Sequence, residues 1–254
     1  MATPAEVRAL SQRILEGDPR ALARAATLAV NQPAVAEELK RSLSAHTGRA
    51  MTIGITGAPG VGKSTLVDQL TRTLRSQGKT VGIVAVDPSS PFSRGAILGD
   101  RIRMQRHHDD PGVFIRSLAS RGKSGGLAEG AREVALLLDA AGRDVVLIET
   151  VGVGQEEVEI ARAADVTVLV LVPGLGDDVQ AMKAGIMEVA DVFAINKSDM
   201  PGADRLEQDI RMMQSLGGEE ERSSAAPVRR VVASDGTGIE DLLAAIRGVF
   251  QNRK

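Results

Sequence analysis

A short glycine-rich loop constrains this 254-residue chain more than any other feature of its sequence. The loop follows an apolar run at residues 51–56 and precedes a helix-forming run that begins at Thr65. Backbone amides wrap around a phosphate only where small residues let the chain curl closely and a helix begins beside it. The spacing therefore predicts a phosphate-binding loop made of Gly57, Ala58, Pro59, Gly60, Val61, Gly62, Lys63 and Ser64, with Thr65 next in the helix.

Two side chains of this loop have the chemistry to act on a nucleoside triphosphate. Lys63 is expected to reach the β and γ phosphates as a point charge, and the Ser64 hydroxyl is expected to ligate the Mg²⁺ that bridges them. The alternative is a glycine-rich turn with a chance lysine. The order of strand, loop and helix start favours the phosphate site.

Composition limits where such a chain works and what it binds. The sequence has no cysteine, which excludes disulfides and thiolate metal sites, and its net charge of −2 provides no basic field for nucleic acid. The first residues lack the pattern of a signal peptide, and no run is long enough to span a membrane. We therefore expect a cytoplasmic protein that binds neither nucleic acid nor membrane, and whose partner is a protein.

The chain divides into a helical start and a long alternating part. Residues 1–48 show apolar residues at helical spacing and are predicted to form a separate N-terminal helical segment, and residues 49–254 are predicted to form the main domain. There, apolar runs alternate with amphipathic ones, which predicts an α/β fold: a P-loop NTPase with a mostly parallel central sheet flanked by helices. The expected strands lie near residues 51–56, 80–86, 113–116, 144–149, 166–172, 191–195 and 228–233.

Acidic residues stand at or after the ends of two of these strands. Asp87 ends the second strand, Asp100 follows it, and Glu149 ends the fourth. Ligands of such sheets bind at the carboxyl ends of the strands, so these carboxylates are expected to hold Mg²⁺, with Glu149 acting on the metal or on a water. Gly152, three residues after Glu149, is expected to sense the γ-phosphate through its amide. The alternative for each acid is an ordinary cap or strand end.

A base-recognition motif follows the sixth strand. The Asp199 carboxylate is expected to accept two hydrogen bonds from a guanine edge, with Lys197 lying along the ring and Asn196 completing the motif. Adenine does not supply these donors, so the motif favours GTP and GDP as ligands. After the last strand, backbone amides at Ser234 and Asp235 are expected to reach the guanine carbonyl, although an ordinary turn explains the same residues.

One polar cluster is expected to have no site chemistry. Residues 107–110 read His-His-Asp-Asp, which looks like a metal cluster. Adjacent residues at the end of a helix point apart, so this stretch is expected to be a solvated loop.

Three longer stretches resemble the methylmalonyl-CoA mutase-associated GTPases, the MeaB-type or ArgK-type G-protein chaperones. They are residues 149–155 (ETVGVGQ), residues 91–101 (PFSRGAILGDR) and residues 176–186 (GDDVQAMKAGI), and the resemblance extends to residues 17–25 (GDPRALARA). It thus covers nearly the whole chain.

The resemblance implies a GTPase that gates delivery of adenosylcobalamin to a cobalamin-dependent acyl-CoA mutase and protects that mutase, with the mutase's cobalamin-binding domain as the expected contact. It implies slow intrinsic hydrolysis that the partner accelerates. Lys63 and Ser64 match the family's phosphate and metal positions, and residues 176–183 resemble its additional switch loop. The remaining matches are Asp87, Asp100 and Glu149 for the metal and Asn196, Lys197 and Asp199 for guanine.

The sequence departs from the family pattern in two places. Arg94 stands where the family usually has glycine, and Lys123 and Ser124 interrupt a glycine-flanked segment. The chain also stops about 15 residues beyond Gly238, whereas relatives continue into a helical dimerisation arm, so the usual homodimer is an open expectation.

Two other functions use the same loop. A GTPase metallochaperone for a nickel enzyme predicts Cys and His ligands near the nucleotide, which the sequence does not offer. A small-molecule kinase has no need to distinguish guanine, so residues 196–199 disfavour it.

Overall fold

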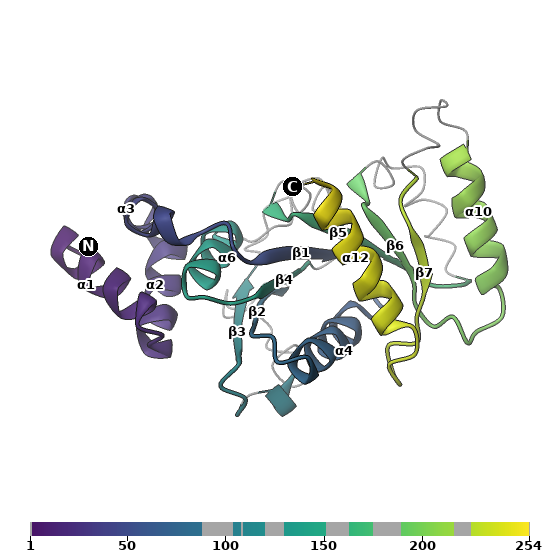
Figure 1. The fold of residues 1–254 in the computed structure, drawn as a ribbon, viewed down its shortest axis with the longest axis horizontal. Coiled ribbons are helices and arrows are strands. Elements are labelled where there is room, and N and C mark those ends of the chain that lie inside the picture. Colours follow the sequence, from purple (N-terminus) through teal and green to yellow (C-terminus); the bar gives the residue numbers. More distant parts are fainter. Residues whose placement is uncertain are drawn as a thin grey trace.

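The computed structural model describes residues 2–87, 104–107, 109–119, 130–150, 163–174, 189–215 and 225–253. Seven parallel strands form one sheet in the order β3-β2-β4-β1-β5-β6-β7 (Figure 1). All seven expected strands are present and differ from the predicted bounds by at most a few residues. They are β1 (Met51–Thr56), β2 (Val81–Asp87), β3 (Val113–Ala119), β4 (Val145–Glu149), β5 (Val166–Leu171), β6 (Val192–Ile195) and β7 (Val228–Arg230).

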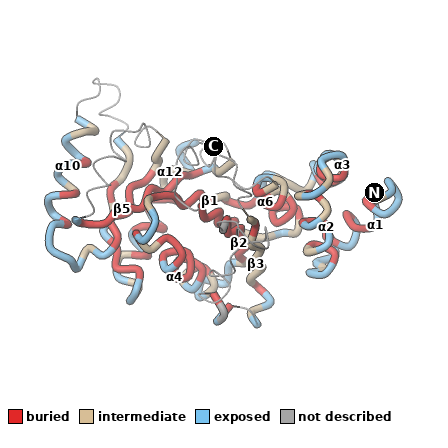
Figure 2. Tube along the Cα trace, turned by 180° about the vertical axis from the view of Figure 1, so that it is seen from behind, coloured by how far each residue is buried: buried red, intermediate tan, exposed pale blue. Residues whose placement is uncertain are grey.

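Helices cover both faces of the sheet. One face carries α4 (Lys63–Ser76) and α12 (Ile239–Arg253), which share a core with the side chains of Ile53, Ile83 and Leu147. The opposite face carries α6 (Ala131–Ala140) at one end and α10 (Ala203–Ser215) at the other. The inner strands β4, β5 and β6 are buried on both faces (Figure 2), and their sequences are nearly continuous apolar runs, whereas the edge strands β3 and β7 are only partly buried.

Three N-terminal helices extend this second face beyond the edge of the sheet. They are α1 (Pro4–Leu15), α2 (Pro19–Asn31) and α3 (Pro33–Leu43), followed by the short 3-10 helix η1 (Ser44–His46). Each of the three begins with proline in its first turn, and Thr3 and Asp18 cap α1 and α2 by accepting backbone N–H bonds. A proline therefore marks the start of each helix in this segment.

The N-terminal helices share one core with the rest of the fold. Leu22 and Leu39 belong to the same buried cluster as Leu138 of α6 and Ile148 of β4. The linker is also fixed, because the Asp139 carboxylate accepts hydrogen bonds from the backbone amides of Gly48, Arg49 and Ala50. The division into two domains at residue 48 stays a prediction, since the helices before it are continuous in packing with α6.

No helix among the described residues is both long and apolar enough to cross a lipid bilayer.

Candidate functional site

The glycine-rich loop connects β1 to the first turn of α4 at the carboxyl edge of the sheet. Gly57 has φ of 139° and Gly62 has φ of 94°, which are left-handed values that favour glycine. A Cβ on Gly57 would collide with the carbonyl oxygen of Val170 in β5, and a Cβ on Gly62 would lie 2.5 Å from Nδ2 of Asn196. Both glycines are therefore required by close approach as well as by backbone conformation.

Lys63 lies inside the curl of this loop. Its side chain is buried, and Nζ donates hydrogen bonds to the carbonyl oxygens of Gly57 (2.7 Å) and Ala58 (3.0 Å). Pro59, Gly60 and Thr65 are exposed around it. The ammonium group is thus held inside the curl of the loop, beside the N-terminus of α4, which is the kind of position that binds anions.

Ser64 meets Glu149 across the carboxyl edge of the sheet. The Ser64 hydroxyl donates a 2.6 Å hydrogen bond to Oε1 of Glu149, and both side chains are buried. Glu149 is the last residue of β4 and stands between Ile55 of β1 and Ala85 of β2 in the sheet register. A hydroxyl and a carboxylate are hard oxygen ligands, so the donor set fits Mg²⁺.

The other predicted metal-side residues are less completely described. Asp87 is the last residue of β2, two positions beyond Ala85, and so its backbone lies at the same edge as Glu149. Asp100 and Gly152 lie outside the described residues, as do Arg94, Lys123 and residues 176–183. Among the described residues there is no cluster of three or more His, Cys, Asp or Glu side chains that would hold a metal by itself.

The base-recognition motif begins at the end of β6, beside the glycine-rich loop. Asn196 is buried; its Nδ2 donates to the carbonyl oxygen of Val61 (2.7 Å), and its Oδ1 accepts from the backbone amide of Ala233 (3.0 Å). This side chain therefore fastens the phosphate loop to the loop after β7. The sequence motif predicts that Asn196 belongs to the base-recognition residues. The contacts with Val61 and Ala233, which are distant in the sequence, show that its side chain positions the two loops.

Lys197 and Asp199 face solvent on the other side of this junction. Lys197 adopts a left-handed φ of 53° and its Nζ donates a 3.2 Å hydrogen bond to the carbonyl oxygen of Gly60. Asp199 is exposed. A lysine stem that reaches toward the phosphate loop, with an exposed carboxylate two residues later, suits a flat base held against the stem.

The loop after β7 completes this side of the site. Ser234 and Asp235 are exposed and lie in a turn that is closed by a hydrogen bond from the Thr237 amide to Asp235 Oδ1 (2.9 Å). The Thr237 N–H lowers the pKa of Asp235 from its ordinary value. The Asp235 side chain thus stabilises its own turn, and the amides of residues 234 and 235 remain candidates for the base carbonyl.

One expectation at this end of the molecule is wrong. His107, in the 3-10 helix η2 (Gln105–His107), is buried and its Nε2 lies 2.8 Å from Oδ1 of Asp68 on α4. Asp110 forms a two-bond ion pair with Arg75 of the same helix. The predicted solvated loop is therefore attached to α4 at two points. Local spacing does not reveal this, because the partners lie 39 and 35 residues away in the sequence.

Comparison with known proteins identifies relatives of the chain. The family model "Methylmalonyl Co-A mutase-associated GTPase MeaB" matches residues 22–253. A protein of Pyrococcus abyssi named as a GTPase is 51% identical, over 94% of this chain and 74% of its own length. The mitochondrial methylmalonic aciduria type A homolog of Caenorhabditis elegans is 41% identical over 58% of this chain and 37% of its own length.

A solved structure has the same fold over nearly the whole chain. The crystal structure described as an LAO/AO transport system kinase superposes with a TM-score of 0.72 at 30% sequence identity, over 98% of this chain and 76% of its own. The P-loop NTPase architecture expected from the alternation of strands and helices is thereby confirmed.

Proposed function

The chain belongs to the methylmalonyl-CoA mutase-associated GTPase family, whose members hydrolyse GTP, and we propose that it is a switch that serves a cobalamin-dependent acyl-CoA mutase. In this proposal the protein hydrolyses GTP slowly alone and faster with the mutase. Its nucleotide state gates adenosylcobalamin delivery to the cobalamin-binding domain of the mutase and protects the loaded enzyme. The family name and the C. elegans relative support a mutase as the partner.

Lys63 and the first turn of α4 are the phosphate-binding elements in this proposal. On nucleotide binding, Lys63 Nζ exchanges its bonds to the Gly57 and Ala58 carbonyls for β and γ phosphate oxygens. The same charge then stabilises the transferring phosphoryl group in the transition state. Gly152 is proposed to sense the γ-phosphate through its backbone amide.

Ser64 and Glu149 are proposed to hold Mg²⁺, with Asp87 and Asp100 as the further acids. Bound Mg²⁺ supplies charge neutralisation between the β and γ phosphates. The Ser64 hydroxyl oxygen, which here donates to Glu149, would be a direct ligand of the metal, and the Glu149 carboxylate would hold it through water, since Mg²⁺ usually keeps several of its waters.

The observation that carries the guanine assignment is the double hydrogen bond of Asn196. By joining Val61 of the phosphate loop to Ala233 of the last loop, Asn196 fixes the distance between phosphate and base elements. Lys197 and Asp199 then project from a rigid junction toward the base, and the amides at Ser234 and Asp235 approach from the other side. Pre-organisation of this kind lets a site reject a base that leaves its polar groups unpaired.

Single-turnover hydrolysis with and without the purified mutase tests this function. We expect GTP, and not ATP, to be hydrolysed slowly by the protein alone, and the mutase to increase the rate by about 10-fold or more, because ordering a switch or supplying an arginine raises such rates strongly. Equal hydrolysis of ATP would favour a kinase-like nucleotide site. A rate that the mutase does not alter would refute the partner assignment.

A further inference from the structure

Two buried threonines join the start of the phosphate loop to the end of β4. Thr56 ends β1, directly before Gly57, and Thr150 directly follows Glu149. The Thr150 hydroxyl donates a 3.3 Å hydrogen bond to Oγ1 of Thr56, and the Thr150 amide donates to the carbonyl oxygen of Ile55 (3.2 Å). Both threonines are at most 1% exposed. The contact therefore holds the two strands together one residue beyond Ile55 and Glu149, the last pair of their register.

Together with the bond between Ser64 and Glu149, this contact closes a ring around the phosphate loop. Residues 57–63 connect Thr56 to Ser64 along the chain. Thr56 is bonded to Thr150 and Ser64 is bonded to Glu149, and these two partners are neighbours in the sequence. Both ends of the loop are thus attached to the end of β4, so the position of the loop and the position of the Glu149 carboxylate depend on each other.

The two bonds of this ring differ in what Mg²⁺ binding does to them. In the proposed function Ser64 is a direct ligand of the metal and Glu149 holds the metal through water, so their direct bond is given up. The bond between Thr56 and Thr150 involves neither of these ligands and is compatible with the metal-bound state. It therefore continues to hold Glu149 beside the start of the phosphate loop.

The two hydroxyl groups are not needed to fill this part of the core. Thr56 lies opposite the buried Leu169 of β5 in the sheet register. Valine has nearly the shape of threonine, is favoured in strands and brings no polar group into the core. When apolar groups of the same shape replace both partners of a buried hydrogen bond, the change in stability is close to neutral. The directional contact is therefore explained by the geometry that it imposes rather than by stability.

We propose that Thr56 and Thr150 are positioning residues for GTP hydrolysis. Their hydrogen bond fixes the Glu149 carboxylate relative to the phosphate loop, and so fixes metal-bound water relative to the β and γ phosphates. This inference rests on the proposed metal role of Glu149, and it adds the residues that set the position of its carboxylate. Because a displacement of about 1 Å in an active site can lower a rate about 10²-fold, loss of the bond slows hydrolysis more than it weakens nucleotide binding.

Single-turnover hydrolysis of GTP by the full chain, with protein and Mg²⁺ in saturating excess, tests this role. Thr150→Val removes the hydroxyl and should lower the rate about 10-fold or more, while the GTP affinity stays within a few-fold of the parent. Thr150→Ser keeps the hydroxyl and should restore the rate to within a few-fold of the parent. The double variant Thr56→Val/Thr150→Val leaves neither hydroxyl unpaired, so it keeps the test decisive if Thr150→Val fails to fold, and it should be as slow as Thr150→Val.

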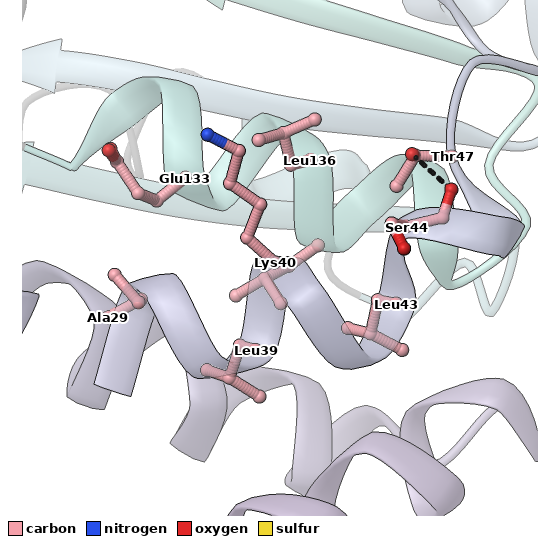
Figure 3. Close-up of a pocket in the computed structure, with 10 residues that line it drawn as sticks. Ala29, Leu39, Lys40, Leu43, Ser44, Thr47, Glu133 and Leu136 are labelled. Atoms are coloured by element: carbon pink, nitrogen blue, oxygen red, sulfur yellow. Dashed lines mark hydrogen bonds between the residues drawn. The ribbon is translucent and has the colours of Figure 1, made fainter. Parts of the chain in front are cut away.

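Two controls separate positioning from a loss of stability. Thr167→Val removes another buried hydroxyl from the same sheet, on β5, and Oγ1 of Thr167 has no hydrogen-bond partner among the described residues. Leu39→Ala removes buried methyl groups at an apolar hollow of about 130 Å³ between α3 and α6 (Figure 3), which no residue of the phosphate loop lines. Leu39→Ala should lower the melting temperature, and both controls should hydrolyse GTP at the rate of the parent.

A hydrolysis rate of Thr150→Val equal to that of the parent would overturn the positioning role. Equally slow Thr150→Val and Thr150→Ser variants would overturn it too, as would a Thr167→Val variant as slow as Thr150→Val. The metal role of Glu149 is judged separately: if Glu149→Gln hydrolyses GTP like the parent, the proposed metal site fails whatever the threonine variants do. A slow Glu149→Gln variant beside a Thr150→Val variant with the rate of the parent would overturn the threonine inference alone.

Discussion

The hydroxyl of Ser64 donates a 2.6 Å hydrogen bond to Oε1 of Glu149, although the two residues are 85 positions apart in the sequence. The bond joins the first turn of α4 to the end of β4 at one edge of the sheet. In a parallel sheet the carboxyl ends of neighbouring strands lie together, so residues from distant motifs meet there. Two of the proposed metal ligands, Ser64 and Glu149, are therefore in direct contact.

The first prediction concerns the dependence of hydrolysis on Mg²⁺. Glu149→Gln and Ser64→Ala should each raise the Mg²⁺ concentration for half-maximal GTP hydrolysis about 10-fold or more, because each removes an oxygen ligand or its charge. Ser76→Ala is the matched control: Ser76 lies at the other end of α4 and donates only to the Thr73 carbonyl. An unchanged Mg²⁺ dependence in both test variants would remove this pair from the metal site.

A second prediction tests base recognition. Asp199→Asn should weaken GTP binding by about 10² to 10⁴ and shift preference toward xanthosine triphosphate, because the amide offers a donor where the xanthine ring has a carbonyl. Affinities from calorimetry give the ratio directly. Asp204→Asn serves as control, since Asp204 is exposed and, within the described residues, pairs with Arg230 alone. If Asp199→Asn still prefers GTP as the parent does, guanine is recognised elsewhere.

The third prediction separates close contact from backbone strain in the glycine-rich loop. Gly60 and Gly62 both have left-handed φ values, of 82° and 94°, but only a Cβ on Gly62 would meet another group, Nδ2 of Asn196 at 2.5 Å. Gly60→Ala should cost about 1–2 kcal/mol of strain. Gly62→Ala should cost roughly 1–3 kcal/mol more, because it displaces a buried hydrogen-bonding amide.

Denaturant unfolding of the nucleotide-free variants measures this difference. Equal free energies of unfolding for Gly60→Ala and Gly62→Ala would show that the Asn196 side chain moves away from the added methyl group with no loss of stability. In that case the junction between phosphate loop and base loop would be soft, and the argument for a pre-organised base site would fail.

Local patterns predicted the elements of this fold better than the contacts between them. The seven strands and the helical character of residues 1–48 follow from apolar periodicity, which is a property of neighbouring residues. The buried pair of His107 with Asp68, and the role of Asn196 between Val61 and Ala233, depend on partners far away in the sequence. Spacing within a motif carries no information about such partners.

The fourth prediction concerns acid stability at the Arg75–Asp110 pair. The Arg75 guanidinium donates two 2.8 Å hydrogen bonds to Asp110 and, together with the Gly112 amide, holds the pKa of this carboxyl below its ordinary value of 3.8. A lowered pKa in the folded state gives stability that is present above the unfolded pKa and is lost as the pH falls through the folded one.

The stability difference between the parent and Asp110→Asn should therefore be constant from about pH 7 to about pH 5 and should shrink below pH 3.8. Unfolding in denaturant at about pH 7, about pH 5 and about pH 3 measures it. A difference that stays constant down to about pH 3 would mean that the ion pair does not contribute through the Asp110 charge.

The last prediction concerns Asp139, which holds the linker between the N-terminal helices and β1. Its buried carboxylate accepts hydrogen bonds from the amides of Gly48, Arg49 and Ala50. Asp139→Ala leaves these three donors without their acceptor, and hydrogen bonds to a charged group are worth about 1.5–3 kcal/mol each, so a total loss of roughly 2–5 kcal/mol is expected after partial rehydration.

Amide hydrogen exchange shows which helices lose stability in the Asp139→Ala variant. Because Leu22 and Leu39 share a core with Leu138 of α6, the loss should be cooperative: exchange should accelerate in α2, α3 and α6 together. Asp209→Ala, at an exposed position of α10, is the control and should leave the free energy of unfolding within about 0.5 kcal/mol of the parent. Faster exchange in α1 to α3 alone, with α6 unchanged, would show instead that the N-terminal helices are an independent unit whose boundary lies at residue 48.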